Sequence, residues 1–240
     1  VALLDNFSWG DPRRPSTLGE LAAAVEGCCA AAYMYNAPFV SGKDSLNNEY
    51  IGNDGKPHAV PPTLVITAVA HVPDANQCVT PDLVEAGNVL MLLGSTEPEF
   101  AGSHLDKVFG APPVAGTAPA PDPDAPNRYR HLHTAIQAGL VASCHDVSEG
   151  GLAVALGEMC LAGLSTSLFS ESLGRLVVEI EPRSVAAFKR IMDDACLQIG
   201  EVNESGLLSL PGVEPILVAD LADAFNHEAY ATDNGLQATS

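Results

Sequence analysis

The residues whose types and spacing could do chemistry are concentrated in one segment, Pro38 to Glu49, which reads PFVSGKDSLNNE. Gly42 follows a short apolar run, and a glycine there lets the backbone approach a ligand closely or adopt a positive φ. Lys43 can present a compact positive charge to a phosphate, Asp44 can face a metal, and Ser45 can donate to an anion. The segment therefore predicts either a strand-to-loop turn that binds phosphate or an ordinary turn with solvated charges.

A second segment with chemical potential is HDVSEGGL, residues 145–152. Gly150 and Gly151 precede a predicted helix, and the free amides of a helix's first turn favour phosphate or carboxylate. Ser148 could assist such a site or could simply cap the helix. Asp146 ends a predicted strand, where its carboxylate could reach a hard cation such as Mg²⁺. The two segments together predict a nucleotide-phosphate and metal site shared by two modules.

The composition limits the classes of protein to which the chain can belong. With 47% hydrophobic and 17% charged residues, most of the 240 residues should fold, as one large domain or two ordinary ones. The 11 basic against 30 acidic residues give a net charge of −19. Binding to nucleic acid or to an anionic membrane is therefore not expected, because phosphate neutralisation needs Lys and Arg.

The cysteines and the N-terminus bear on the cellular compartment. None of the six cysteines forms a C-x-x-C pair, which argues against a zinc site or a disulfide framework. There is neither a run of 18 apolar residues nor a basic region followed by an apolar one at the N-terminus. We expect a cytoplasmic protein. Because the chain starts with Val on a strand-like run, we also expect a piece of something longer.

Hydrophobic periodicity and turn residues predict the elements that must position these segments. The predicted helices are 17–35, 127–140, 152–162, 184–195 and 221–227; the predicted strands include 1–5, 63–72 (buried), 89–93, 175–180 and 197–202. The Ala- and Pro-rich residues 111–126 should form an extended loop. Strands that alternate with helices predict an α/β or α+β architecture. We place the boundary after residue 97, so that 1–97 and 98–240 form two modules and strand 89–93 closes the first.

Five segments in order carry a family resemblance: DNFSWGDPRRP, PFVSGKDSLNNEY, PPTLVITAVAHVPD, AGSH and HDVSEGGLAVALGEM. From Val1 to about His227 the chain resembles the C-terminal part of phosphoribosylformylglycinamidine synthases, of the aminoimidazole-ribonucleotide-synthetase-like superfamily. The resemblance implies a two-module α/β fold in which one module pairs its sheet with a second copy and the other covers the cleft. On this basis 1–97 is the end of an incomplete first module.

The resemblance also implies an activity, the ATP- and Mg²⁺-dependent amidation of formylglycinamide ribonucleotide in purine biosynthesis. It implies three protein partners: the N-terminal half of the same enzyme, a glutaminase subunit that supplies ammonia, and a small accessory subunit. The family's catalytic histidines lie in the first half, so we expect no catalytic residue here and no turnover by this chain alone. Two alternatives remain, a non-catalytic nucleotide-binding half or another superfamily member such as aminoimidazole ribonucleotide synthetase.

Individual roles carry over only where this sequence matches the family pattern. Asp5 and Gly42 match nucleotide-contacting positions, and Ser45 matches a position near the substrate. Lys43 departs from a common form of the pattern, which has a metal-binding Asn, so the resemblance here implies a phosphate contact. Asp146 matches the acid of the second motif and is the implied metal ligand.

Overall fold

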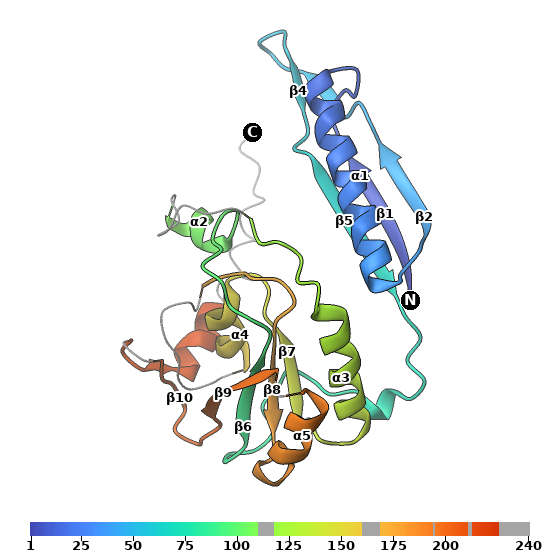
Figure 1. The fold of residues 1–240 in the computed structure, drawn as a ribbon. Helices are drawn as coiled ribbons and strands as arrows, with labels where there is room; N and C mark the ends of the chain where they lie inside the picture. The colour runs from blue at the N-terminus through green and yellow to red at the C-terminus, as the bar shows by residue number, and fades with distance from the viewer. Residues whose placement is uncertain (110–117, 160–168, 194, 211–212, 226–240) are drawn as a thin grey trace. The chain divides into compact units, whose positions relative to one another are not determined.

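The computed structural model describes residues 1–109, 118–159, 169–193, 195–210 and 213–225 (Figure 1). Its elements in chain order are β1 (Ala2–Ser8), α1 (Pro15–Tyr35), β2 (Phe39–Ser45), β3 (Glu49–Ile51), β4 (Pro57–Ala59), β5 (Thr63–Val69), η1 (Ala75–Gln77), β6 (Val89–Leu93), α2 (His104–Phe109), α3 (Ala125–Gln137), β7 (Ser143–Asp146), α4 (Gly151–Met159), β8 (Leu176–Ile180), η2 (Pro182–Ser184), α5 (Val185–Ile191), β9 (Cys196–Glu201), β10 (Leu207–Leu208) and β11 (Ile216–Leu217). The mixture of helices and strands confirms the predicted fold class.

The chain forms two compact units, Val1–Ala75 and Asn76–Ser240. The structure thus divides the chain earlier than the predicted boundary after residue 97. The reason is β6, which we expected to close the first module. Instead β6 pairs with β8 on one side and β9 on the other, so it belongs to the sheet of the second unit.

The first unit is built on the sheet β2-β1-β5, with α1 lying along one of its faces (Figure 1), and it also contains the two-stranded sheet β3-β4. β1 and β2 run parallel, while β5 is antiparallel to β1. The predicted buried strand 63–72 is β5, but it is not buried. Val65 and Val69 are 53% and 54% exposed, because β5 is hydrogen-bonded on one side only and nothing described in this unit covers the face opposite α1.

Two local features of this unit differ from the sequence expectation. The stretch 41–45, predicted as a loop, continues β2 as far as Ser45, because its backbone pairs with β1 along the whole length. The start of the first helix also differs, because it was predicted at residue 17 and lies at Pro15. Helix α1 begins after Arg14 with Pro15 in its first turn, where a missing N–H costs nothing, and it ends at Asn36 with a left-handed φ of 50°.

The second unit is built on the antiparallel sheet β7-β8-β6-β9. The run VLMLL of β6 is buried along its whole length and contributes to two cores. Leu90 and Leu92 pack with Leu152 and Leu156 of α4. The alternate β6 residues belong to the other core, with side chains from α3 and α5. A strand with helices on both faces must be apolar at every position, which explains the unbroken hydrophobic run.

Several predictions fall wholly or partly outside the described residues. They are the loop at 111–117, the end of the third helix beyond Met159, and the last two residues of the terminal helix predicted at 221–227. The described part of that terminal helix is helical and begins earlier, over residues 218–225. The loop prediction is wrong at Ala125 and Pro126, which open α3, because Pro is tolerated in the first turn. Within the described ranges, no helix is long and apolar enough to cross a membrane.

Candidate functional site

In the first unit, Asp5 and Gly42 lie side by side on neighbouring strands. They are register partners in the β1–β2 ladder. A Cβ atom added to Gly42 would lie 2.0 Å from Oδ1 of Asp5 and 2.7 Å from its Cγ. The absence of a side chain at Gly42 is therefore what makes room for the Asp5 carboxylate. The glycine was predicted to allow the close approach of a ligand, and the group that lies against it is the protein's own carboxylate.

The Asp5 side chain faces α1 and lines a pocket of about 360 Å³ between helix and sheet. Its other lining residues are Phe7, Leu21, Val25, Cys28, Cys29, Phe39, Asp44 and Leu46. Burial, with smaller contributions from Asp5 and Cys29, raises the pKa of the Cys28 thiol. Cys28 is thus held as a neutral thiol beside the carboxylate, and the pocket combines apolar walls with the acids Asp5 and Asp44.

Lys43 and Ser45 lie on the other face of the sheet. Side chains alternate along a strand, so these two residues point away from the face that Gly42 shares with Asp5. Lys43 Nζ donates a hydrogen bond to Ser45 Oγ. The structure therefore separates the predicted nucleotide contacts of this segment: Asp5 and Gly42 lie beneath α1, whereas Lys43 and Ser45 lie on the uncovered face.

Substituting Gly42 by alanine tests the packing against Asp5. Alanine in a strand normally stabilises relative to glycine by about 0.5–1 kcal/mol. Here we expect Gly42→Ala to lower the free energy of unfolding of the first unit by about 1–3 kcal/mol, because the new methyl overlaps the carboxylate. Urea unfolding followed by the fluorescence of Trp9, the single tryptophan and a buried residue of this unit, measures the change.

A double-mutant cycle identifies the cause. In an Asp5→Ala background the cost of Gly42→Ala should largely disappear. Gly27→Ala is the matched control, since an added Cβ at this α1 glycine meets nothing within 4 Å and should stabilise the unit. An equal cost of Gly42→Ala with and without Asp5 would contradict this interpretation.

In the second unit, Asp146 ends β7 and presents an exposed carboxylate immediately before the turn into α4. Its side chain is 69% exposed. Ser148 Oγ donates to Asp146 Oδ2 at 2.6 Å, so Ser148 orients the acid. His145 Nδ1 lies 2.7 Å from the Asp146 carbonyl oxygen, and its Nε2 lies 3.1 Å from Glu158 Oε2. The polar side chains of this turn therefore hold one another in place and leave Oδ1 the more available acceptor.

The two glycines of this turn donate their amides within the protein. Gly150 has a φ of 75°, and its N–H donates to Glu171 Oε1 at 2.8 Å. The Gly151 N–H donates to the Ser148 carbonyl at 3.0 Å. Neither amide is thus presented to a phosphate in this conformation, in contrast to the sequence prediction. What the turn offers to a ligand is the carboxylate of Asp146.

The charge of Asp146 also acts on the strand behind it. Burial, with a smaller contribution from Asp146, raises the pKa of the Cys144 thiol to about 11. Cys144 is therefore a buried neutral thiol at neutral pH and no candidate nucleophile.

The residues present suit a metal carried by a nucleotide better than a metal held by the protein alone. In the described parts of the chain, no group of three or more His, Cys, Asp or Glu side chains is arranged to hold a metal ion. Mg²⁺ bound with nucleotides usually takes one or two carboxylates and completes its shell with phosphate oxygens and water. A single exposed Asp146 carboxylate fits that pattern.

Three polar residues with structural roles were not predicted: Arg175 and Glu179, which are buried, and Glu171, which is half-buried. Glu171 contacts Gly150 of the motif, Arg175 supports the backbone beside Glu171, and Glu179 accepts four hydrogen bonds in the sheet. Each stands in or beside an apolar run with no motif around it. The only available signal was a charged residue in the predicted strand 175–180, which applies to Arg175 and Glu179 and not to Glu171.

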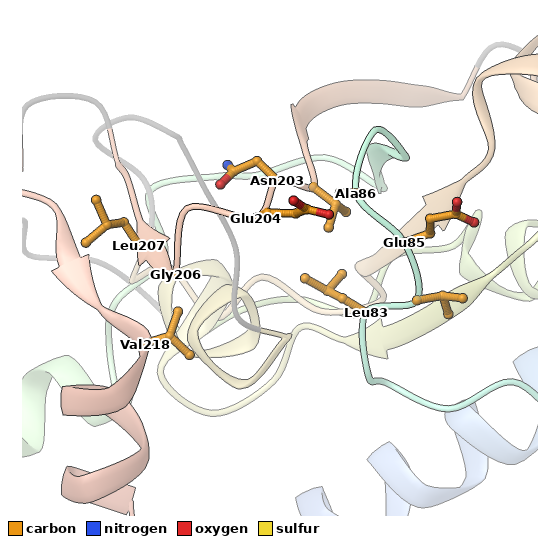
Figure 2. A pocket seen from close by; sticks show the side chains of 10 residues that line it. Leu83, Glu85, Ala86, Asn203, Glu204, Gly206, Leu207 and Val218 are labelled. Carbon is orange, nitrogen blue, oxygen red and sulfur yellow. The ribbon is translucent and has the colours of Figure 1, made fainter.

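A further pocket of about 380 Å³, shown in Figure 2, contains none of the predicted site residues. It lies where β6 begins and β9 ends, because its walls are Leu83–Ala86 and the segment from Val202 to Leu207, together with Val218. Asp146 lies at the other end of the sheet, because it pairs with Leu176 at the start of β8, and Leu176 also pairs with Leu93 at the end of β6. The pocket is therefore separate from the turn that carries Asp146.

Comparison with known proteins gives the class of protein that this fold represents. Residues 85–167 match the family described as AIR synthase related protein, C-terminal domain. The match covers about a third of the chain and includes every element from β6 to α4. The α/β fold of the chain is thus similar to that of AIR synthase related proteins over this region.

A particular protein, PurL, is similar to nearly the whole chain. It is 34% identical over 234 residues to the phosphoribosylformylglycinamidine synthase subunit PurL of Lactobacillus helveticus (strain DPC 4571), covering 92% of this chain and 31% of that protein. The fold is similar to Thermotoga maritima PurL complexed with FGAR (TM-score 0.65, 16% identity, 92% of this chain and 39% of that one). It is also similar to T. maritima PurL complexed with ATP (TM-score 0.62, 16% identity, 92% and 37%). The chain thus spans about a third of the length of the curated relative.

Proposed function

We propose that the chain is the nucleotide-binding C-terminal part of a PurL-type C–N ligase, which amidates formylglycinamide ribonucleotide at the expense of ATP. The identity to a PurL subunit over nearly the whole chain supports this proposal, as do the PurL structures that contain ATP or FGAR. The proposed protein partners are the N-terminal half of the synthetase, a glutaminase subunit that provides ammonia, and a small accessory subunit.

The observation that carries the proposal is the exposed carboxylate of Asp146 at the end of β7. Mg²⁺, when bound there with ATP, would supply charge neutralisation of the triphosphate. Asp146 Oδ1 would hold the metal, while Ser148 keeps Oδ2 engaged and so fixes the orientation of the acid. The turn would thus position the nucleotide rather than carry out proton transfer.

Lys43 and Ser45 are the proposed contacts for the phosphate of the ribonucleotide. They lie together on the uncovered face of the first sheet, with Lys43 Nζ already hydrogen-bonded to the Ser45 hydroxyl. A Lys ammonium and a serine hydroxyl offer several donors to a phosphate. Asp5 and Gly42 act indirectly in this proposal, by shaping the strand that presents Lys43.

Replacing Asp146 tests the nucleotide site. We expect Asp146→Asn to weaken Mg-ATP binding by the chain about tenfold, because the amide is a poorer ligand for Mg²⁺ than a carboxylate. Isothermal calorimetry with Mg-ATP, repeated with ATP and EDTA, separates the metal-dependent part: without Mg²⁺ the variant and the wild type should bind ATP equally.

Glu204→Gln provides the control for the removal of one negative charge, since this exposed acid lies by the pocket at the other end of the sheet. It should leave Mg-ATP affinity unchanged. Wild-type chain that binds no Mg-ATP, or an Asp146→Asn variant that binds it as tightly as wild type, would contradict the proposed site.

A further inference from the structure

Three segments that are distant in sequence leave the same end of the second sheet. Leu93 at the end of β6 and Leu176 at the start of β8 are register partners, and Asp146 at the end of β7 pairs with the same Leu176. The chain after Leu93 leads to α2, the chain after Asp146 leads to α4, and the residues before Leu176 include Glu171. These connections must be held together if the turn that carries Asp146 is to have one conformation.

The Glu171 carboxylate makes that connection. Its Oε1 accepts a hydrogen bond from the Gly150 N–H at 2.8 Å and another from the His104 N–H, also at 2.8 Å. The ring atom His104 Nδ1 lies 3.4 Å from the same oxygen. One oxygen atom thus ties the first residue of α2 to the glycine that precedes α4. Neither amide belongs to the segment that supplies the acceptor.

The backbone on both sides of Glu171 is fixed. Ser170 is fully buried and Ser172 is 4% exposed. Ser170 Oγ donates to the Glu97 carbonyl at 2.6 Å, and the Glu97 N–H donates to Ser172 Oγ at 3.0 Å. The buried guanidinium of Arg175 donates to the carbonyls of both serines, at 2.5 and 3.0 Å. Glu171 is therefore presented from a backbone that is hydrogen-bonded on both sides, which limits the positions that its carboxylate can take.

We propose that Glu171 is a positioning residue that holds Gly150 and thereby sets the direction of the turn bearing Asp146 and Ser148. Gly150 can adopt the left-handed region, with φ of 75°, because it lacks a side chain, and the hydrogen bond from its N–H to Glu171 selects that conformation among those open to glycine. In this arrangement a ligand's phosphate is held by way of the metal that Asp146 would bind. The Gly150 N–H does not contact the phosphate, because it donates to Glu171. The part of the inference that concerns a nucleotide rests on the proposed function.

Hydrogen exchange of a ¹⁵N-labelled chain tests the positioning directly. Glu171→Gln keeps the size of the side chain but removes its charge, and it weakens the acceptor shared by two amides. We expect exchange at Gly150 and His104 to accelerate together about tenfold, while amides in β6 and β8 keep their rates. A merely structural role would accelerate exchange throughout the second unit. Glu204→Gln is the charge-matched control and should leave both amides unchanged.

Mg-ATP titration of the same variants provides the second readout. We expect Glu171→Gln to weaken Mg-ATP binding several-fold without a change in thermal midpoint. Unchanged exchange at Gly150 and His104 in Glu171→Gln would overturn the proposal, as would accelerated exchange combined with wild-type Mg-ATP affinity. A wild-type chain that binds no Mg-ATP would overturn the proposed function. In that case the exchange rates at Gly150 and His104 alone would show whether Glu171 positions the turn.

Discussion

Glu179→Gln should lower the free energy of unfolding of the second unit by about 2–4 kcal/mol, although it changes one oxygen atom to a nitrogen. Glu179 is fully buried in β8. Its Oε1 accepts hydrogen bonds from the Glu85 N–H at 3.0 Å and from Asn88 Nδ2 at 2.8 Å. Its Oε2 accepts from the Val84 N–H at 2.9 Å and from Ser143 Oγ at 2.8 Å.

The size of the effect follows from the direction of these hydrogen bonds. All four partners of Glu179 are donors, and an ionised carboxylate accepts at both oxygens. A glutamine accepts at one end only, so its NH₂ group would face two donors, one of which is a backbone N–H that cannot rotate. A buried donor left without an acceptor costs about 1–3 kcal/mol. The segment from Val84 to Asn88 should lose part of its attachment to the sheet and keep the backbone hydrogen bonds that Gly87 and Asn88 make with Val202.

Urea unfolding followed by far-ultraviolet circular dichroism measures the change as a lower midpoint at unchanged slope. Glu181→Gln is the matched control two residues further along, because Glu181 is partly exposed and paired with the exposed Arg183. This control should change stability by less than about 1 kcal/mol. If the two substitutions had equal effects, the four hydrogen bonds of Glu179 would not be what stabilises this region.

Arg175→Ala should destabilise the same unit by about 3 kcal/mol. The side chain is 2% exposed and donates to the carbonyls of Ser170 and Ser172 and, at 2.9 Å, to Thr96 Oγ1. Burial lowers the pKa of this guanidinium, with Glu99 opposing the effect. Its removal leaves a cavity and two buried carbonyls without their donor. These losses outweigh the free energy gained because a charge is no longer buried.

Arg175→Lys separates charge from geometry. A lysine keeps the charge but cannot donate in three fixed directions, so we expect it to recover less than half of the lost stability. Arg183→Ala removes an arginine whose side chain is 84% exposed and should change stability by less than about 0.5 kcal/mol. Urea midpoints for the three variants test this order. Full recovery by lysine would show that the three directed hydrogen bonds do not matter.

The regular elements were predictable because their signals are local. The apolar spacing of residues 17–35 predicted α1, and the unbroken run Val89–Leu93 predicted β6. The position of Asp146 at a strand end could also be predicted, since the turn residues that follow it are adjacent in sequence. The resemblance to phosphoribosylformylglycinamidine synthases came from ordered segments and agrees with the PurL-like comparisons.

The roles of individual site residues were less predictable. Lys43 and Asp5 were grouped in one set of nucleotide contacts, yet strand alternation in β2 places Lys43 on the opposite face of the sheet from Asp5. The loop predicted at 41–45 has no such alternation, so the separation does not follow from the sequence. The expected phosphate donors Gly150 and Gly151 proved to have internal acceptors.

Amino-acid order alone was sufficient for what depends on neighbouring residues: the period of each helix, the strand that must be apolar on both faces, and the glycines that permit a left-handed turn. The tertiary structure alone decided which buried or half-buried charges hold these pieces together. Glu179 meets donors up to 95 residues away, and Glu171 meets the His104 amide 67 residues away. The physical reason is that an isolated buried carboxylate is costly, so it must find its donors wherever the fold places them, and no local pattern records where that is.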